Sequence, residues 1–290
     1  MKRIILRGVP AVAIALAVAL PGLAQQLKPK SNEELEALKA MFGAQTADAR
    51  IAAAENVLTK FKDTDFKAVA LYFEAASYRE KGDYEHTVVF GERTLEADPK
   101  HYQAMLMLAA VIAAHTKEFD LDREDKLAQV EKYCNTALEL LKDAPKPNPN
   151  LTDDQWAGAK KDFAADGHAA LGMGAMARKK YDVAESEFKI AIDTAQKPDP
   201  SNMVRLGKAY MDDGKYDDAI AQFDKVMAMQ DINVQVRQVA QAERVRAFQK
   251  RQPNRTPRSS RRFPICARIW TPWRSPPVTG SRTGRSSAAR

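Results

Sequence analysis

Residues 168–191 read HAALGMGAMARKKYDVAESEFKIA, and residues 203–226 read MVRLGKAYMDDGKYDDAIAQFDKV. The two stretches align at a spacing of 35 residues. The aligned pairs of identical residues are Leu171 and Leu206, Gly172 and Gly207, Lys180 and Lys215, Tyr181 and Tyr216, Asp182 and Asp217, Ala184 and Ala219, and Phe188 and Phe223. A period of this length is typical of arrays of helical units, in which stacked neighbours bury a face that no unit can bury alone.

A third copy lies upstream, where Tyr78, Gly82, Tyr84 and Pro99 follow the same scheme. These residues resemble the tetratricopeptide repeat (TPR), a helix–turn–helix unit of about 34 residues. Residues 200–233 carry nearly the full pattern of that family: Leu206, Gly207, Tyr210, Gly214, Tyr216, Ala219 and Phe223.

The other two copies depart from the family pattern. Residues 165–198 have Ala175 in the place of Tyr and Lys179 in the place of the turn Gly, and residues 68–101 have Thr87 and Gly91 in the places of Ala and Phe. The resemblance implies an all-α, TPR-type solenoid of helical hairpins, wound as a right-handed superhelix. The small residues Gly172, Ala184, Gly207 and Ala219 then allow two antiparallel helices to approach closely. The bulky residues Tyr181, Phe188, Tyr216 and Phe223 fill the space between repeats.

This interpretation divides the chain into seven segments. They are a signal peptide (1–24), the N-terminal helices of a degenerate repeat (25–67), two TPR-like repeats (68–144), a Pro/Asn linker (145–151), two TPR repeats (152–233), a capping helix (234–250) and a disordered basic tail (251–290). Within the second TPR-like repeat, a surplus of nine residues falls around 118–125. We expect Thr152 to begin a helix that bends or breaks near Asp166 and Gly167.

The charge of the chain is concentrated at its two ends. The net charge is +7, but three basic residues lie in the first seven positions and eleven in residues 250–290, which leaves −7 for residues 25–249. The basic start, the apolar run Val9–Leu20 and the small residues Gly22 and Ala24 predict a cleaved signal peptide and hence an exported chain; an uncleaved N-terminal anchor is the alternative. We expect no transmembrane segment in the mature chain.

The segment after residue 250 contains six Pro and two Trp and no acidic residue. It offers no periodic apolar face, so we expect it to be disordered. Our hypothesis is that a shifted reading frame replaces the proper end of the protein after about residues 249–253. The competing interpretation is a genuine basic arm for an anionic surface or nucleic acid, in which Trp270 and Trp273 stack on bases.

No motif in the sequence predicts a cofactor, a metal site or a catalytic group. The best metal candidate is Asp120–Glu131, which has oxygen ligands at several positions of an EF-hand loop but has Asp125 where that loop needs Gly. These acidic residues are better explained as the start of a helix, where the helix dipole favours negative charge. We therefore expect no enzyme activity, no metal, no cofactor and no nucleic-acid partner.

The resemblance places a partner-binding groove on the first helices of the repeats. The family's ligand-facing positions fall on Tyr72, Ala76, Arg79, Leu106, Ala110, Met173, Met176, Val204, Lys208 and Met211. This lining is mostly apolar or small, and methionine adapts to irregular partner surfaces. We expect an apolar helix or an extended segment of another protein as the ligand; the alternative is that these side chains pack against the chain's own helices.

The predicted function is thus a protein-binding scaffold or adaptor outside the cytoplasm, in the periplasm or beyond the cell. The alternative is an accessory of envelope assembly or secretion that recognises unfolded or membrane-protein segments.

Overall fold

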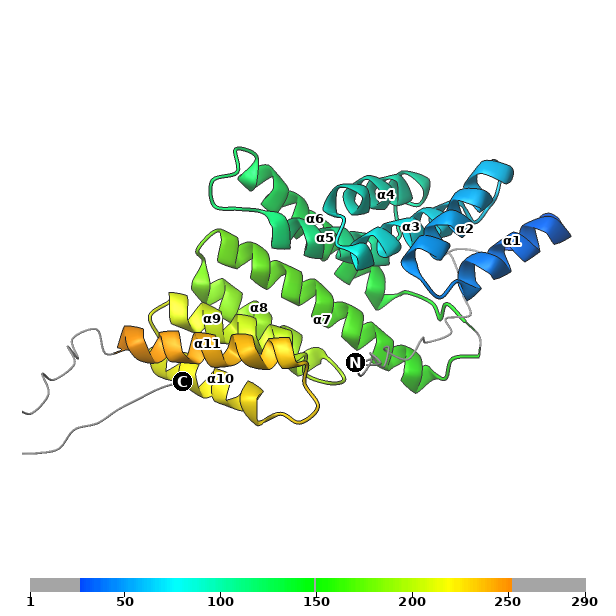
Figure 1. Ribbon diagram of the computed structural model, residues 1–290. Helices are drawn as coiled ribbons and strands as arrows, with labels where there is room; N and C mark the ends of the chain where they lie inside the picture. The colour runs from blue at the N-terminus through cyan, green and yellow to red at the C-terminus, as the bar shows by residue number, and fades with distance from the viewer. Residues whose placement is uncertain (1–26, 149, 252–290) are drawn as a thin grey trace, which may run out of the picture. The chain divides into compact units, whose positions relative to one another are not determined.

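The computed structural model describes residues 27–148 and 150–251, and these residues form eleven helices and no strand (Figure 1). The helices are α1 (Asn32–Gly43), α2 (Ala47–Lys60), α3 (Lys67–Lys81), α4 (Tyr84–Ala97), α5 (Tyr102–His115), α6 (Arg123–Lys142), α7 (Asp153–Ala177), α8 (Tyr181–Thr194), α9 (Pro200–Asp212), α10 (Tyr216–Ala228) and α11 (Val234–Arg251). The predicted signal peptide and C-terminal tail lie outside the described residues.

The helices pair as five successive hairpins followed by a single helix. Each odd-numbered helix from α1 to α9 packs against the helix that follows it, and that second helix packs against the first helix of the next pair. Residues buried from successive pairs form a series of core clusters along the chain. This arrangement confirms the predicted all-α, TPR-type solenoid for the described residues.

The two regular repeats owe their close helix packing to glycine. A Cβ atom on Gly172 of α7 would lie 2.7 Å from Cε1 of Phe188 on α8, and one on Gly207 of α9 would lie 2.6 Å from Cε1 of Phe223 on α10. Both rings are fully buried. Phe188 also shares a core cluster with Leu206 of the next repeat, so its ring fills the space between repeats as the sequence predicts.

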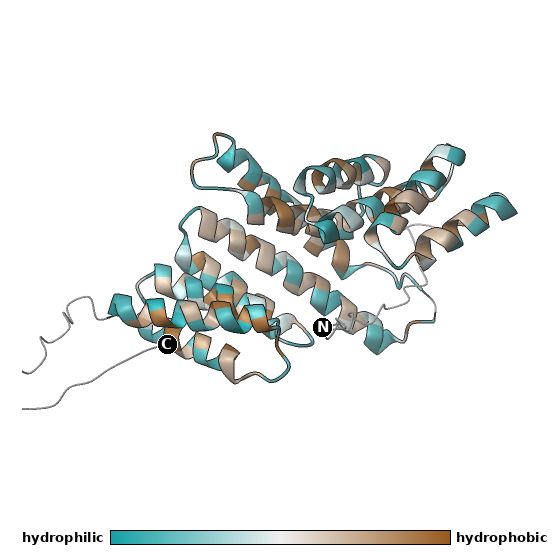
Figure 2. Cartoon of the chain, in the orientation of Figure 1, coloured by the Kyte–Doolittle hydropathy of each residue, from teal (hydrophilic) through white to brown (hydrophobic). Residues whose placement is uncertain are grey.

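Among the helices that the structure describes, α5 has the largest share of buried residues. Eight of its fourteen residues are buried, and Figure 2 shows apolar residues gathered along its length. It packs against α4, α6 and α7. A helix that is apolar on nearly all sides belongs in the interior, and this position lets α5 contribute both to the core and to the surface described below.

Helix α7 corrects one prediction, because it runs without a break from Asp153 to Ala177. Thr152 caps it as expected: its Oγ1 accepts from the backbone N–H of Gln155, and Oε1 of Gln155 accepts from the N–H of Thr152. Gly167 does not interrupt the helix. A Cβ atom there would lie 3.2 Å from Cδ2 of Leu106 and of Leu138, so this glycine allows α5 and α6 to approach α7 closely.

Helix α11 closes the described part of the solenoid. It packs on α9 and α10, and its only buried residues, Ala240 and Ala247, lie seven positions apart on one face. The rest of its surface carries mainly polar and charged residues, together with the exposed side chains of Val234, Val239 and Val245. Among the described residues, no helix is both long and apolar enough to cross a membrane.

Candidate partner-binding groove

A groove runs over the first helices of four repeats. Its narrower part is a hollow of about 240 Å³ lined by α3, α5, α7 and the start of α9. Its wider part is a hollow of about 470 Å³ at the C-terminal ends of α5, α7 and α9. Met173 and Arg205 line both hollows, which makes the two parts continuous.

Seven of the ten predicted ligand-facing residues lie in this groove. The narrower part is lined by Tyr72, Arg79, Leu106, Ala110 and Met173, and the wider part by Met173, Met176 and Lys208. The floor is therefore apolar and partly built of methionine. The structure thus brings these side chains from α3, α5, α7 and α9 to one surface.

The other three predicted residues do not line the groove. Ala76 is half-buried and lies outside both hollows. Val204 and Met211 are buried in the same core cluster as Ala240 and Ala247 of α11. Because α11 covers this face of α9, the two side chains pack inside the protein, which is the alternative that the sequence left open.

The residues of α9 that line the groove are instead Asn202, Arg205 and Asp212, together with Lys208. These polar residues recur every three or four positions, so they lie on one face of the helix. That spacing was available in the sequence, but the family's ligand positions point to the neighbouring apolar face. Other lining residues of the narrower hollow that the sequence did not single out are Gln103, Met107, Phe163, Asp166, Ala169 and Asp199.

Four charged groups line the narrower hollow without an ion-pair partner. None of Arg79, Arg205, Asp166 and Asp199 has an oppositely charged group within 4.0 Å among the described residues. Burial raises the pKa of Asp166, and the guanidinium of Arg79 opposes that rise. Charged groups of both signs that line a groove without ion-pair partners can bind a ligand that carries both donors and acceptors.

Two side chains at this site are fixed by local contacts. Nη1 of Arg205 donates to Oδ1 of Asn202 at 2.7 Å, which holds the guanidinium along the wall of the hollow. Oδ1 of Asp199 accepts from the N–H of Ser201 at 2.9 Å and so caps α9. The side-chain amide nitrogen of the buried Asn202 remains a donor for a peptide carbonyl.

The described residues bring together no group of three or more His, Cys, Asp or Glu side chains that could hold a metal. The acidic residues of the EF-hand-like stretch are engaged otherwise. Lys126 forms ion pairs with Asp120 and Asp122, and Arg123 and Arg178 form ion pairs with Glu124.

The sequence matches no protein-family model and no curated protein. Solved structures with a similar fold include a thermophilic TPR protein of Thermus thermophilus (21% identity, 74% of this chain and 98% of that chain, TM-score 0.46). They also include a TPR protein of Parabacteroides merdae (14% identity, 77% of this chain and 92% of that chain, TM-score 0.39). A third is Acl4, an assembly chaperone of RpL4 (12% identity, 78% of this chain and 99% of that chain, TM-score 0.41). The TPR-type fold of the described residues rests on their own helical pairs and on the glycine–phenylalanine contacts within them.

Proposed function

We propose that this chain is a non-enzymatic scaffold that binds a segment of another protein along the groove of α3, α5, α7 and α9. The observation that carries this proposal is the continuity of the groove, in which an apolar floor is edged by charged groups without ion-pair partners among the described residues. Such a surface suits a polypeptide, because apolar side chains of the ligand are buried on the floor while its backbone and charges meet the polar edge.

The ligand is best described as an extended or helical segment with several apolar side chains. Met173 lies where the two hollows meet and Met176 lines the wider one, and flexible thioethers accommodate apolar groups of different shapes. This feature favours the second candidate function, an accessory of envelope assembly or secretion that recognises unfolded or membrane-protein segments of varied sequence. The two functions share one groove and differ in the number of partners.

Photo-crosslinking tests this proposal. A photoreactive phenylalanine derivative replaces Lys208, whose exposed side chain lines the wider hollow, in the full chain expressed in its own host. The same replacement at Lys132, an exposed residue of α6 outside both hollows, is the matched control. We expect protein adducts from position 208 alone, and we expect Arg205→Glu to abolish them.

One dominant adduct supports a dedicated scaffold, and many adducts support the accessory of envelope assembly. Equal adducts from positions 208 and 132, or adducts that survive Arg205→Glu in a folded variant, contradict binding in the groove.

We further propose that the chain acts outside the cytoplasm. This part rests on the sequence of residues 1–24, in which a basic start precedes an apolar run and small residues. N-terminal sequencing of the chain isolated from its host tests it. A new N-terminus close to Gln25 is the expected result, and an intact Met1 in the cytoplasmic fraction contradicts it.

A further inference from the structure

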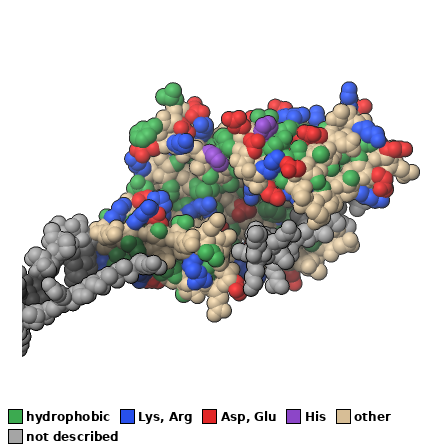
Figure 3. All heavy atoms as spheres, viewed as in Figure 1, with side chains coloured by type: hydrophobic (Ala, Val, Ile, Leu, Met, Phe, Trp, Pro, Cys, Tyr) green, Lys and Arg blue, Asp and Glu red, His purple; other side chains and the backbone are tan. Residues whose placement is uncertain are grey.

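The connection between α5 and α6 presents two large apolar side chains to solvent. Residues 116–122 join these helices, whereas three residues are enough between α7 and α8 and between α9 and α10. Within this connection Phe119 is 89% exposed and Leu121 is fully exposed, more than any other large apolar side chain among the described residues. In Figure 3, hydrophobic side chains project where Figure 1 shows this connection.

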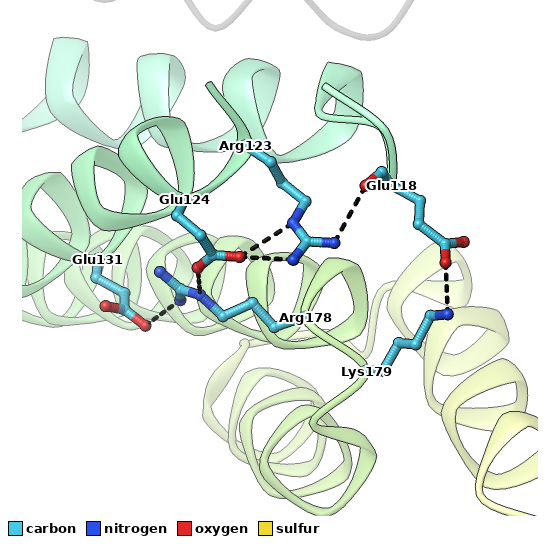
Figure 4. A network of polar contacts seen from close by, with 6 residues as sticks. All are labelled: Glu118, Arg123, Glu124, Glu131, Arg178 and Lys179. Atoms are coloured by element: carbon cyan, nitrogen blue, oxygen red, sulfur yellow. Dashed lines mark hydrogen bonds and ion pairs between the residues drawn. The ribbon is translucent and has the colours of Figure 1, made fainter. Parts of the chain in front are cut away.

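The loop that carries these two side chains is held in place by polar contacts (Figure 4). Oε1 of Glu118 lies 2.5 Å from Nζ of Lys179, just beyond α7. Nη1 of Arg123 donates to the carbonyl oxygen of Glu118 at 3.1 Å. The N–H of Lys117 donates to Oδ2 of Asp120 at 3.0 Å. A loop that is already ordered loses less conformational entropy when it binds, so its apolar side chains are presented at a lower cost.

The charges that face solvent around this loop are mainly acidic. The side chains of Glu124, Asp122 and Glu118 are 60%, 58% and 48% exposed. Among the cations paired with them, Lys179 is 57% exposed, whereas Arg178 and Lys126 are only 13% and 30% exposed. Arg178 is largely covered because it bridges Glu124 and Glu131, at 2.9 and 2.5 Å. A partner that approaches Phe119 therefore meets more carboxylate than ammonium or guanidinium, which favours basic residues on the partner.

The loop is also continuous with the groove. Thr116 and Glu118 line the wider hollow together with Met176 and Lys179, and Phe119 is the next residue of the chain. A segment that fills this hollow and leaves it past the Glu118–Lys179 ion pair reaches the loop directly. An exposed aromatic side chain beside a binding groove is the kind of residue that carries binding energy in protein interfaces.

We propose that Phe119 and Leu121 are a second anchor for the protein segment that the groove binds, and that this segment continues past Glu118 as an amphipathic stretch of apolar and basic side chains. The inference rests on the proposed function, because it takes the groove to be the first anchor. It adds the chemistry of the ligand and a contact that lies outside the groove.

The test uses the full chain and a fluorescent amphipathic peptide of leucine and lysine, with a leucine–glutamate peptide of the same pattern as the charge control. Fluorescence anisotropy gives the dissociation constants. We expect the chain to bind the lysine peptide at least tenfold more tightly than the glutamate peptide. Phe119→Ser combined with Leu121→Ser should weaken that binding at least tenfold, since both side chains lose their apolar contact with the peptide.

Two further variants make the outcomes distinguishable. Val89→Ser combined with Val183→Ser removes exposed apolar groups, 50% and 43% exposed, that lie outside the groove and the loop, and should leave binding unchanged. Met176→Ser alters the groove and should weaken binding as well. If Met176→Ser weakens binding and the loop variant does not, the second anchor is wrong and the groove function stands. If the loop variant acts alone, or if both peptides bind equally, the inference is also overturned.

Discussion

Glu74 is a buried acidic residue whose replacement should stabilise the N-terminal repeats. Its side chain on α3 is fully buried, and neither carboxylate oxygen has a hydrogen-bond partner among the described residues. Burial, helped by the nearby Glu55 of α2, raises its pKa to about 7 against the opposing effect of Arg93 on α4. A carboxylate at this position is therefore disfavoured relative to the protonated acid.

The magnitude follows from the shift in pKa. A rise from 4.5 to about 7 corresponds to roughly 3 kcal/mol, since each pKa unit corresponds to about 1.4 kcal/mol. Because the folded chain holds the proton more tightly than the unfolded chain, the free energy of unfolding falls as the pH rises from 4.5 to about 7. Above this range the buried carboxylate lowers the free energy of unfolding by its full amount, and below this range it does not lower it. Glu74→Gln removes the titrating group and with it this pH dependence.

Urea unfolding at pH 5 and pH 8 measures the effect, together with hydrogen exchange of the α3 amides. At pH 8 the free energy of unfolding of the Glu74→Gln variant should exceed that of the parent chain by up to roughly 3 kcal/mol. At pH 5 the difference should be much smaller, because Glu74 of the folded parent is then mostly protonated. Glu96→Gln on α4, which replaces an exposed glutamate, is the control and should change neither value. Equal differences between Glu74→Gln and the parent at both pH values would refute the reasoning.

Two further predictions concern the regular repeats. Ala219→Trp should destabilise the last hairpin by about 1–3 kcal/mol or more, because Ala219 is fully buried and the site has no room; Lys208→Ala, which removes only an exposed ion pair with Asp212, should unfold like the parent in urea. Lys179→Gly should be more stable than Lys179→Ala by up to about 1 kcal/mol, since both lose the ion pair with Glu118 and only alanine keeps a side chain at a φ of +60°. Equal urea midpoints for the Gly and Ala variants would show that this backbone conformation carries no strain.

The repeat pattern was enough to predict the fold because the residues that define it act locally. Gly207 and Phe223 meet within one hairpin, so their spacing in the sequence determines how the two helices pack. The unbroken α7 could not be predicted in this way. Gly167 weakens a helix by its intrinsic preference, and only contacts with Leu106 and Leu138, far away in the sequence, explain why the helix continues through it.

The candidate groove was predicted less completely, and α9 shows the reason. The family pattern indicates which helices line a groove, but the exposed face of the last one depends on what packs next to it. Here α11 covers Val204 and Met211, so Asn202 and Arg205 become the lining. The pattern of a single repeat does not contain that information, because the covering helix begins more than twenty residues later.

Two departures from the repeat pattern, at Gly91 and Lys179, are each matched by a contact with another helix or loop, and one of these pairs lies at the edge of the groove. Gly91 stands where a regular repeat has Phe, and Leu108 of α5 occupies the space, since a Cβ atom on Gly91 would lie 2.7 Å from Cδ2 of Leu108. Lys179 stands where a regular repeat has Gly, and its ammonium contacts Glu118 of the long α5–α6 loop. The first exchange lies in the core and preserves packing. The Lys179–Glu118 contact instead joins the turn after α7 to the long α5–α6 loop. Both side chains are exposed to solvent, so core packing does not explain this contact. The ligand that we propose, which contacts both the groove and the loop, accounts for a loop that is long, exposes Phe119 and Leu121 and is tied to the turn after α7.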